Sequence, residues 1–339
     1  MAENENKGEF TTALSVWNTT VTNAVSGDFK SIGVPFDDYS KTCASNAMCA
    51  VYDLAVRSNV NLKEADMSSL VGVVKNAASL KLNYNMSECY FQIRKKNIRG
   101  KYVDTFEFGV QGKGNEAMLR NFGVGVKKVY SPWLVMEGDE FTYPKRKGLR
   151  MEPPEWTPKG LSNKCVRVVY PVLLADDEEE YLIAERDQVA ISLFAHVRQN
   201  LLNETFGICP NIHKATAEQK EKIKEKKEPI LEALRACKTV DEMLACEAAR
   251  PYMSLAWLDT PESMIQTKMR NKAIKPFPKD LNPIAKESLL MIDEVYRAHK
   301  EEEAIEANSI EFVPEEEEAN SEEFIIDAEE VTSEESADV

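Results

Sequence analysis

Apolar residues recur at helical spacing along the first eighty residues of the chain. From residue 37 to residue 56 they return every three or four positions, which places them on one face of a helix. The same spacing appears over residues 67–79 and, less regularly, over residues 10–25. The sequence therefore predicts three amphipathic helices before residue 80.

Alternation by two replaces helical spacing after Glu88. Tyr90 and Ile93 in one run, and Phe106 and Phe108 in the next, lie among alternating apolar positions, which is typical of half-buried strands. The connection over residues 94–101 is rich in Lys and Arg. We therefore expect a two-stranded hairpin with a basic tip.

Shorter elements are expected after this hairpin. A helix is predicted over residues 115–122, and the strands at 127–130 and 140–143 are expected to continue the sheet. A strand over 166–174 turns through acidic residues 176–180 and returns at 181–184. Further helices are predicted at 185–203, 215–237 and 239–247, and another begins at Pro261, capped by Thr260 or Asp259. The fold class predicted is α+β, a small antiparallel sheet with packed helices.

The charge of the chain is divided unevenly. The net charge is −15, but residues 301–339 hold 17 acidic and no basic residues, which leaves 40 acidic and 42 basic residues in the rest. Residues 94–150 contain 13 basic and 6 acidic residues. A basic, aromatic-bearing pair of strands is a natural surface for a nucleic-acid strand.

The acidic tail, residues 301–339, has too few apolar residues to fold alone, so we expect it to be disordered, as we do residues 1–9. Phe324, Ile325 and Ile326 form an apolar island within it. Two interpretations stay open: a solvating tail, or a peptide that docks on a partner.

Composition suggests a soluble protein of the cytoplasm. No apolar run approaches the ~18 residues that a membrane span requires, and no apolar signal segment follows the polar start. The seven cysteines lack Cys-x-x-Cys spacing, which suits reduced thiols.

Signals for catalysis are weak. No phosphate-binding loop of the Gly-x-x-x-x-Gly-Lys-Ser/Thr type is present, and the histidines lack metal-ligand spacing. We therefore expect no catalytic residue, metal or cofactor. One alternative is a metal-dependent nuclease, because the carboxylates of Glu137, Asp139 and Glu140 lie near Lys145 in the sequence.

An ordered set of features resembles the RecT family of phage single-strand annealing proteins. These features are a helix ending in Leu80-Lys-Leu-Asn83, a strand with the aromatic pair Tyr90-Phe91, a strand closing on Gly109-x-x-Gly112, and a helix after it. Matches to the next strand pair, to Trp257 and to residues 264–278 extend the resemblance. It implies a core over residues 10–204 and 251–300, with residues 205–250 as a helical insertion.

The resemblance also implies where DNA is bound. Lys268, Lys272 and Lys275 share one face of the late helix, at positions where family members carry basic residues that contact DNA. With the cations of the hairpin and of the helix after it, the expected DNA-binding residues are Lys95, Lys96, Arg99, Lys101, Lys113, Arg120, Lys268, Lys272 and Lys275.

The function implied is binding of single-stranded DNA and annealing of complementary strands without ATP, in phage or prophage homologous recombination in a bacterial host. Expected partners are single-stranded DNA, the annealed duplex, further copies of the chain in a ring or filament, and an exonuclease or a host single-strand-binding protein. A second alternative is a passive single-strand-binding protein.

Overall fold

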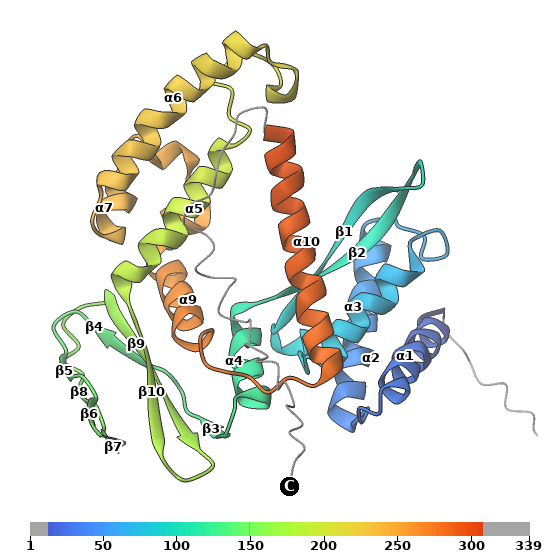
Figure 1. The fold of residues 1–339 in the computed structure, drawn as a ribbon, viewed down its shortest axis with the longest axis horizontal. Helices are drawn as coiled ribbons and strands as arrows, with labels where there is room; N and C mark the ends of the chain where they lie inside the picture. Colours follow the sequence, from blue (N-terminus) through green and yellow to red (C-terminus); the bar gives the residue numbers. More distant parts are fainter. Residues whose placement is uncertain (1–12, 149, 308–339) are drawn as a thin grey trace, which may run out of the picture.

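The structure is a computed structural model that describes residues 13–148 and 150–307 (Figure 1). The segment predicted to be disordered at 1–9, and the acidic tail beyond residue 307, lie outside the described residues. Helices and small antiparallel sheets make up the fold, which confirms the predicted α+β class. Two large hydrophobic cores divide it into two lobes, and a small third cluster contains Cys209, Ile212 and Ile223.

The first lobe gathers the N-terminal helices, one hairpin and the last helix around one core. Its elements are α1 (Ala13–Ser31), α2 (Asp38–Arg57), α3 (Met67–Ser79), η1 (Tyr84–Met86), β1 (Cys89–Ile98), β2 (Lys101–Val110) and α10 (Pro283–Ala307). Met48, Leu70, Phe106 and Ile284 meet in this core. Asp37 and Asp66 begin α2 and α3 by accepting backbone N–H groups of the first turn, as capping residues do. The predicted helices 37–56 and 67–79 are confirmed.

The second lobe is built on a four-stranded antiparallel sheet. Its strands are β9 (Cys165–Leu174), β10 (Glu179–Glu185), β3 (Val126–Val129) and β4 (Trp133–Met136). Its helical elements are η2 (Arg186–Val189), α5 (Ala190–Leu201), η3 (Ile212–Lys214), α6 (Ala217–Ala236), α7 (Val240–Ala245), η4 (Arg250–Tyr252), α8 (Leu255–Asp259) and α9 (Pro261–Ile274). Tyr170, Leu193, Leu234 and Trp257 are buried in its core. Thr260 precedes Pro261 at the start of α9, but its side chain accepts no capping hydrogen bond there.

Two short ribbons extend from this sheet. β5 (Glu140–Thr142) pairs with β8 (Glu155–Thr157), and β6 (Lys145–Lys147) pairs with β7 (Arg150–Glu152). Figure 1 shows both ribbons beside the sheet, at the side of the molecule away from α10.

The expectation that the strands near 127–130 and 140–143 continue the hairpin sheet is wrong. β3 pairs with β9 and β5 pairs with β8, whereas β1 and β2 pair with each other. The cause is α4 (Gly112–Phe122), which carries the chain between the lobes. Met118 and Phe122 of α4 enter the first core, while Leu119 enters the second.

The charged helix predicted at 215–237 is α6, and it is partly buried. Ile223, Leu231 and Leu234 of α6 are buried, and the last two lie in the second core. Arg186, which is 6% exposed, binds Asp241 of α7 at 2.7 Å and Glu262 of α9 at 2.5 Å. These contacts hold α7 against η2 and α9 within the second lobe.

The last helix passes the predicted end of the core. α10 continues through residue 301 to Ala307, beyond the boundary at residue 300 that was expected between core and tail. The first turns of α10 are held in place by packing. Ile284, Ala285 and Ile292 lie in the first core, and the hydroxyl groups of Ser288 and Ser79 are 2.8 Å apart. Glu and Ala residues, which are good helix formers, can then extend the helix.

Candidate nucleic-acid interface

The hairpin of β1 and β2 presents its cations on two different faces. Consecutive residues of a strand point to opposite sides, so Lys95 and Lys96 cannot line the same face. Lys95 lies on the side of Phe91 and Ile93, which pack on the first core, whereas Lys96 lies on the outer side. Arg99 and Gly100 form the two-residue turn, with φ values of 53° and 84° that match a tight hairpin turn.

A buried carboxylate occupies part of the outer face. Glu107 is 8% exposed, and both Arg94 and Lys96 contact it at 3.0 Å. These two cations therefore stabilise the hairpin. Lys95, Arg99 and Lys101 are exposed, and no carboxylate among the described side chains pairs with them.

Tyr90 gives the outer face an aromatic surface. Its ring lies over Gly109, because a Cβ at that position would come within 2.1 Å of the ring. The close contact at Gly109 is therefore with the Tyr90 side chain, and the φ of Gly109 is not positive. The Tyr90 hydroxyl lies 2.9 Å from that of Tyr296 on α10.

The N-terminus of α4 lies between the hairpin and α9. Gln111 precedes the helix without forming a side-chain cap, so the N–H groups of Gly112 and Lys113 point out of the first turn. Gly114 is wedged against β1, since a Cβ there would lie 2.1 Å from the carbonyl oxygen of Glu88. Asn115 donates to Asn271 of α9 at 3.2 Å. The positive end of the α4 dipole thus borders α9.

The basic face of α9 consists of Lys268, Lys272 and Lys275, which we call the α9 lysine face. Lys268 and Lys272 are half-buried and Lys275 is exposed. No ion pair joins these lysines to a carboxylate in the described part of the chain. Burial, and then the charge of Lys275, lower the pKa of Lys268. The carboxylate of Asp293 on α10 interacts with the charge of Lys275 without forming a salt bridge. Three ammonium groups without salt-bridge partners form a site of positive potential.

α10 lies between this face and the hairpin. Tyr296 contacts β1, and burial raises the pKa of Asp293 against the opposing charges of Arg297 and Lys275. Figure 1 shows α10 running beside β1 and β2 with α9 on its other side. The two basic regions predicted from the sequence are therefore separated by this helix.

The remaining predicted cations differ in their surroundings. Lys113 is exposed in the first turn of α4, where it adds to the positive end of the helix. Arg120 lies two turns later and pairs with Glu88 at 3.4 Å, and that glutamate is 5% exposed. Arg120 therefore balances a buried charge.

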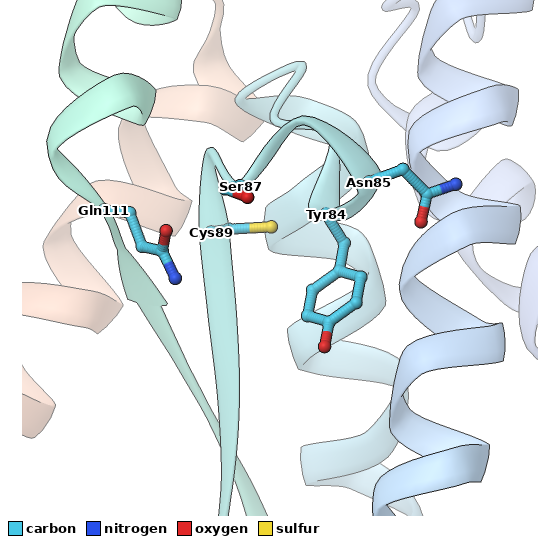
Figure 2. Close-up of a pocket in the computed structure, with 5 residues that line it drawn as sticks. All are labelled: Tyr84, Asn85, Ser87, Cys89 and Gln111. Atoms are coloured by element: carbon cyan, nitrogen blue, oxygen red, sulfur yellow. The ribbon is translucent and has the colours of Figure 1, made fainter.

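An open pocket of about 500 Å³ lies beside the start of α4. Figure 2 shows Gln111 on one side of Cys89 and Tyr84 on the other, with Ser87 at the turn and Asn85 completing the lining. The lining is polar and uncharged, and burial raises the pKa of Cys89 to about 12, which keeps its thiol protonated.

The carboxylates considered for a nuclease have structural partners. Asp139 accepts the N–H groups of Lys159 at 2.7 Å and Met136 at 2.9 Å, and these bonds lower its pKa. Glu137 pairs with Lys164, and Glu140 with Lys159. Among residues 13–148 and 150–307, no group of His, Cys, Asp or Glu has the arrangement of a metal site. No helix of that part is long and apolar enough to cross a membrane.

Two features of this region were not among the predicted site residues. Arg94 lies on the outer face with Lys96, a position that strand alternation alone would have given. Lys279 follows α9 and donates to the carbonyl groups of Lys275 at 3.0 Å and Phe277 at 2.9 Å. Burial lowers the pKa of Lys279 to about 8. No pattern in the sequence indicated this contact.

Comparison with known proteins gives the family. The profile of the RecT family matches residues 53–311, which is more than half of the chain and includes β1, β2, α4 and α9. No curated protein shows significant similarity to the chain. The chain therefore belongs to the RecT family, and with that membership comes a role in recombination by annealing single strands of DNA.

Proposed function

We propose that this protein binds single-stranded DNA on the α9 lysine face and the adjoining start of α4, and anneals a complementary strand without ATP. The observation that carries the proposal is the α9 lysine face, whose ammonium groups form no salt bridge with a carboxylate among the described residues. The exposed hairpin cations Lys95, Arg99 and Lys101 extend the basic surface.

The mechanism follows from electrostatics. Lysines that bind phosphates replace condensed counterions and reduce the repulsion between two strands. The N–H groups at the start of α4 offer further donors to a phosphate. A strand held by its backbone keeps its bases free to pair, so sequence is tested by base pairing. No step requires nucleotide hydrolysis, in keeping with the missing phosphate-binding loop.

The setting is part of the same proposal. We place the protein in the cytoplasm of a bacterial host, acting for a phage or prophage, as copies arranged in a ring or filament along the DNA. Its partners are the single strand, the annealed duplex, and an exonuclease or host single-strand-binding protein that supplies or covers the strands.

The salt dependence of strand binding tests the site. Replacing Lys268, Lys272 and Lys275 with Gln keeps the apolar stems but removes three charges. We expect weaker binding of an oligonucleotide and a shallower slope of log K against log salt, by up to about 0.7 for each lost phosphate contact. Equilibrium anisotropy titrations between low and moderate salt measure both quantities.

A matched variant on the β6–β7 ribbon is the control. Lys145, Arg146 and Lys147 are exposed on that ribbon, so K145Q/R146Q/K147Q removes the same charge elsewhere. We expect it to leave affinity and slope nearly unchanged. Loss of slope in the ribbon variant, with none in the α9 variant, would place the strand on the ribbon and refute the proposed site.

A further inference from the structure

No salt bridge joins the α9 lysine face to a carboxylate of the described residues, although the charges of Lys275 and Asp293 interact. The chain beyond the described residues is strongly anionic. Residues 308–339 contain 13 acidic and no basic residues in a stretch of 32. Bringing three ammonium groups together on one helix costs free energy through mutual repulsion, and an anionic segment nearby relieves it. The two parts of the chain are therefore complementary in charge.

The geometry lets the tail reach this face. α9 ends at Ile274 and α10 begins at Pro283, so the base of α10 lies near the end of α9. α10 has 25 residues and is thus about 37 Å long. It reaches η3 in the second lobe, at its upper end in Figure 1. A further 32 residues can span at most about 110 Å, which is ample to return along α10 to Lys275.

Other basic surfaces suit the tail less well. The cations of the β6–β7 ribbon are exposed to water, and Lys147 is already paired with Glu152. Screening by water and salt weakens such exposed charges, whereas the half-buried Lys268 and Lys272 interact more strongly with an anion. In Figure 1 that ribbon also lies on the side of the molecule away from α10.

We infer that the acidic segment 308–339 docks on the α9 lysine face of its own chain and competes there with single-stranded DNA. The competing role rests on the proposed function, whereas the docking does not. A tethered segment is present at an effective concentration of up to about millimolar, so even a weak contact is occupied. DNA displaces the tail where its own phosphate contacts outnumber those of the tail. Long DNA strands therefore displace the tail from the α9 lysine face more readily than short anions do.

Lysine labelling without DNA tests the docking. The full chain is compared with a variant in which each Asp and Glu of residues 308–339 is replaced by Asn or Gln. Brief acetylation at low salt, measured peptide by peptide by mass spectrometry, gives the reactivity of each lysine. We expect Lys268, Lys272 and Lys275 to react roughly threefold or more faster in the amide variant, since their tethered anion is lost.

Internal controls accompany each measurement. Lys145 and Lys147 should react equally in both proteins, and the difference at α9 should vanish near 1 M salt, where the Debye length is about 3 Å. Equal reactivity of the α9 lysines in both proteins at low salt would overturn the inference. Protection that moves to Lys145 and Lys147, or that grows with protein concentration as binding to a second copy requires, would overturn it too.

A measurement of DNA affinity distinguishes docking of the tail from competition with DNA. If the tail competes, the amide variant binds a short single strand roughly threefold or more tightly than the full chain at low salt. A protein ending at Ala307 should behave like the amide variant, because α10 is retained. Protection of the α9 lysines without any change in strand affinity would uphold docking, overturn competition, and contradict the placing of DNA on this face.

Discussion

Single residues set the junction between the hairpin and the proposed DNA-binding face. Gly114 lets the first turn of α4 lie against β1, and Asn115 then bonds Asn271 of α9. This contact holds the positive end of α4 beside the lysines. The sequence drew attention to Gly109 and Gly112, but the backbone contact is at Gly114, because only the folded chain brings the carbonyl of Glu88 to that position.

Replacement of Gly114 by Ala tests this contact. A Cβ at Gly114 would meet the Glu88 oxygen at 2.1 Å, so we expect a loss of about 1–3 kcal/mol in unfolding free energy, as for other overpacked sites. Gly72 in α3 is the matched control, since nothing lies within 4 Å of its added Cβ and its φ is not positive. G72A should stabilise the protein by up to about 1 kcal/mol. Urea denaturation measures both; equal effects would contradict the packing described.

His196 should make stability depend on pH. Its Nε2 accepts the Ser254 N–H at 3.0 Å, so that nitrogen carries no proton. Burial, and then the charge of Lys268, lower its pKa. The unfolded pKa is about 6.5, so the stabilisation is present above that pH and is lost as pH falls through the lower folded value.

The variant H196Q keeps an acceptor for Ser254 but does not titrate. We expect the full chain to lose unfolding free energy between pH 7.5 and pH 5, and H196Q to lose less over the same range. Chemical denaturation at several pH values gives the comparison. Identical pH profiles would show that His196 does not contribute.

Elements with strong local patterns were predicted well. α2 and α3 lie within a residue or two of their predicted bounds, because their apolar faces repeat over several turns and an Asp caps each. β1 and β2 were also found, since their alternation is regular. Pairing between distant strands was not found: β3 and β5 are short, and their partners β9 and β8 come later in the chain.

The candidate site was predicted only in part, for physical reasons that can be named. Helical spacing placed Lys268, Lys272 and Lys275 on one face, and the structure keeps them together. Counting charges along the chain could not tell Lys95 from Lys96, nor show that Glu107 neutralises Lys96 and Arg94. It also could not place α10 between the hairpin and α9, because that contact joins residues about two hundred positions apart.

At the scale of the whole molecule, two lobes meet through α4, α9 and α10. α4 contributes to both cores, and α10 packs on the first lobe and reaches η3 of the second. The basic face lies on α9 near this junction, so movement of one lobe against the other would change its access. The sequence combines a near-neutral body with a strongly acidic tail. We infer from this that the molecule carries both a cationic site and a competitor for it.

The central claim is that the protein itself speeds pairing of complementary strands and uses no nucleotide. Two labelled complementary oligonucleotides are mixed with the full chain in the absence of ATP and metal ions, and duplex formation is followed by fluorescence transfer. Strands without complementarity are the control. We predict pairing well above the spontaneous rate, unchanged by added ATP and slowed in the K268Q/K272Q/K275Q variant. Binding that leaves pairing at the spontaneous rate, or pairing that strictly requires ATP, would contradict the account.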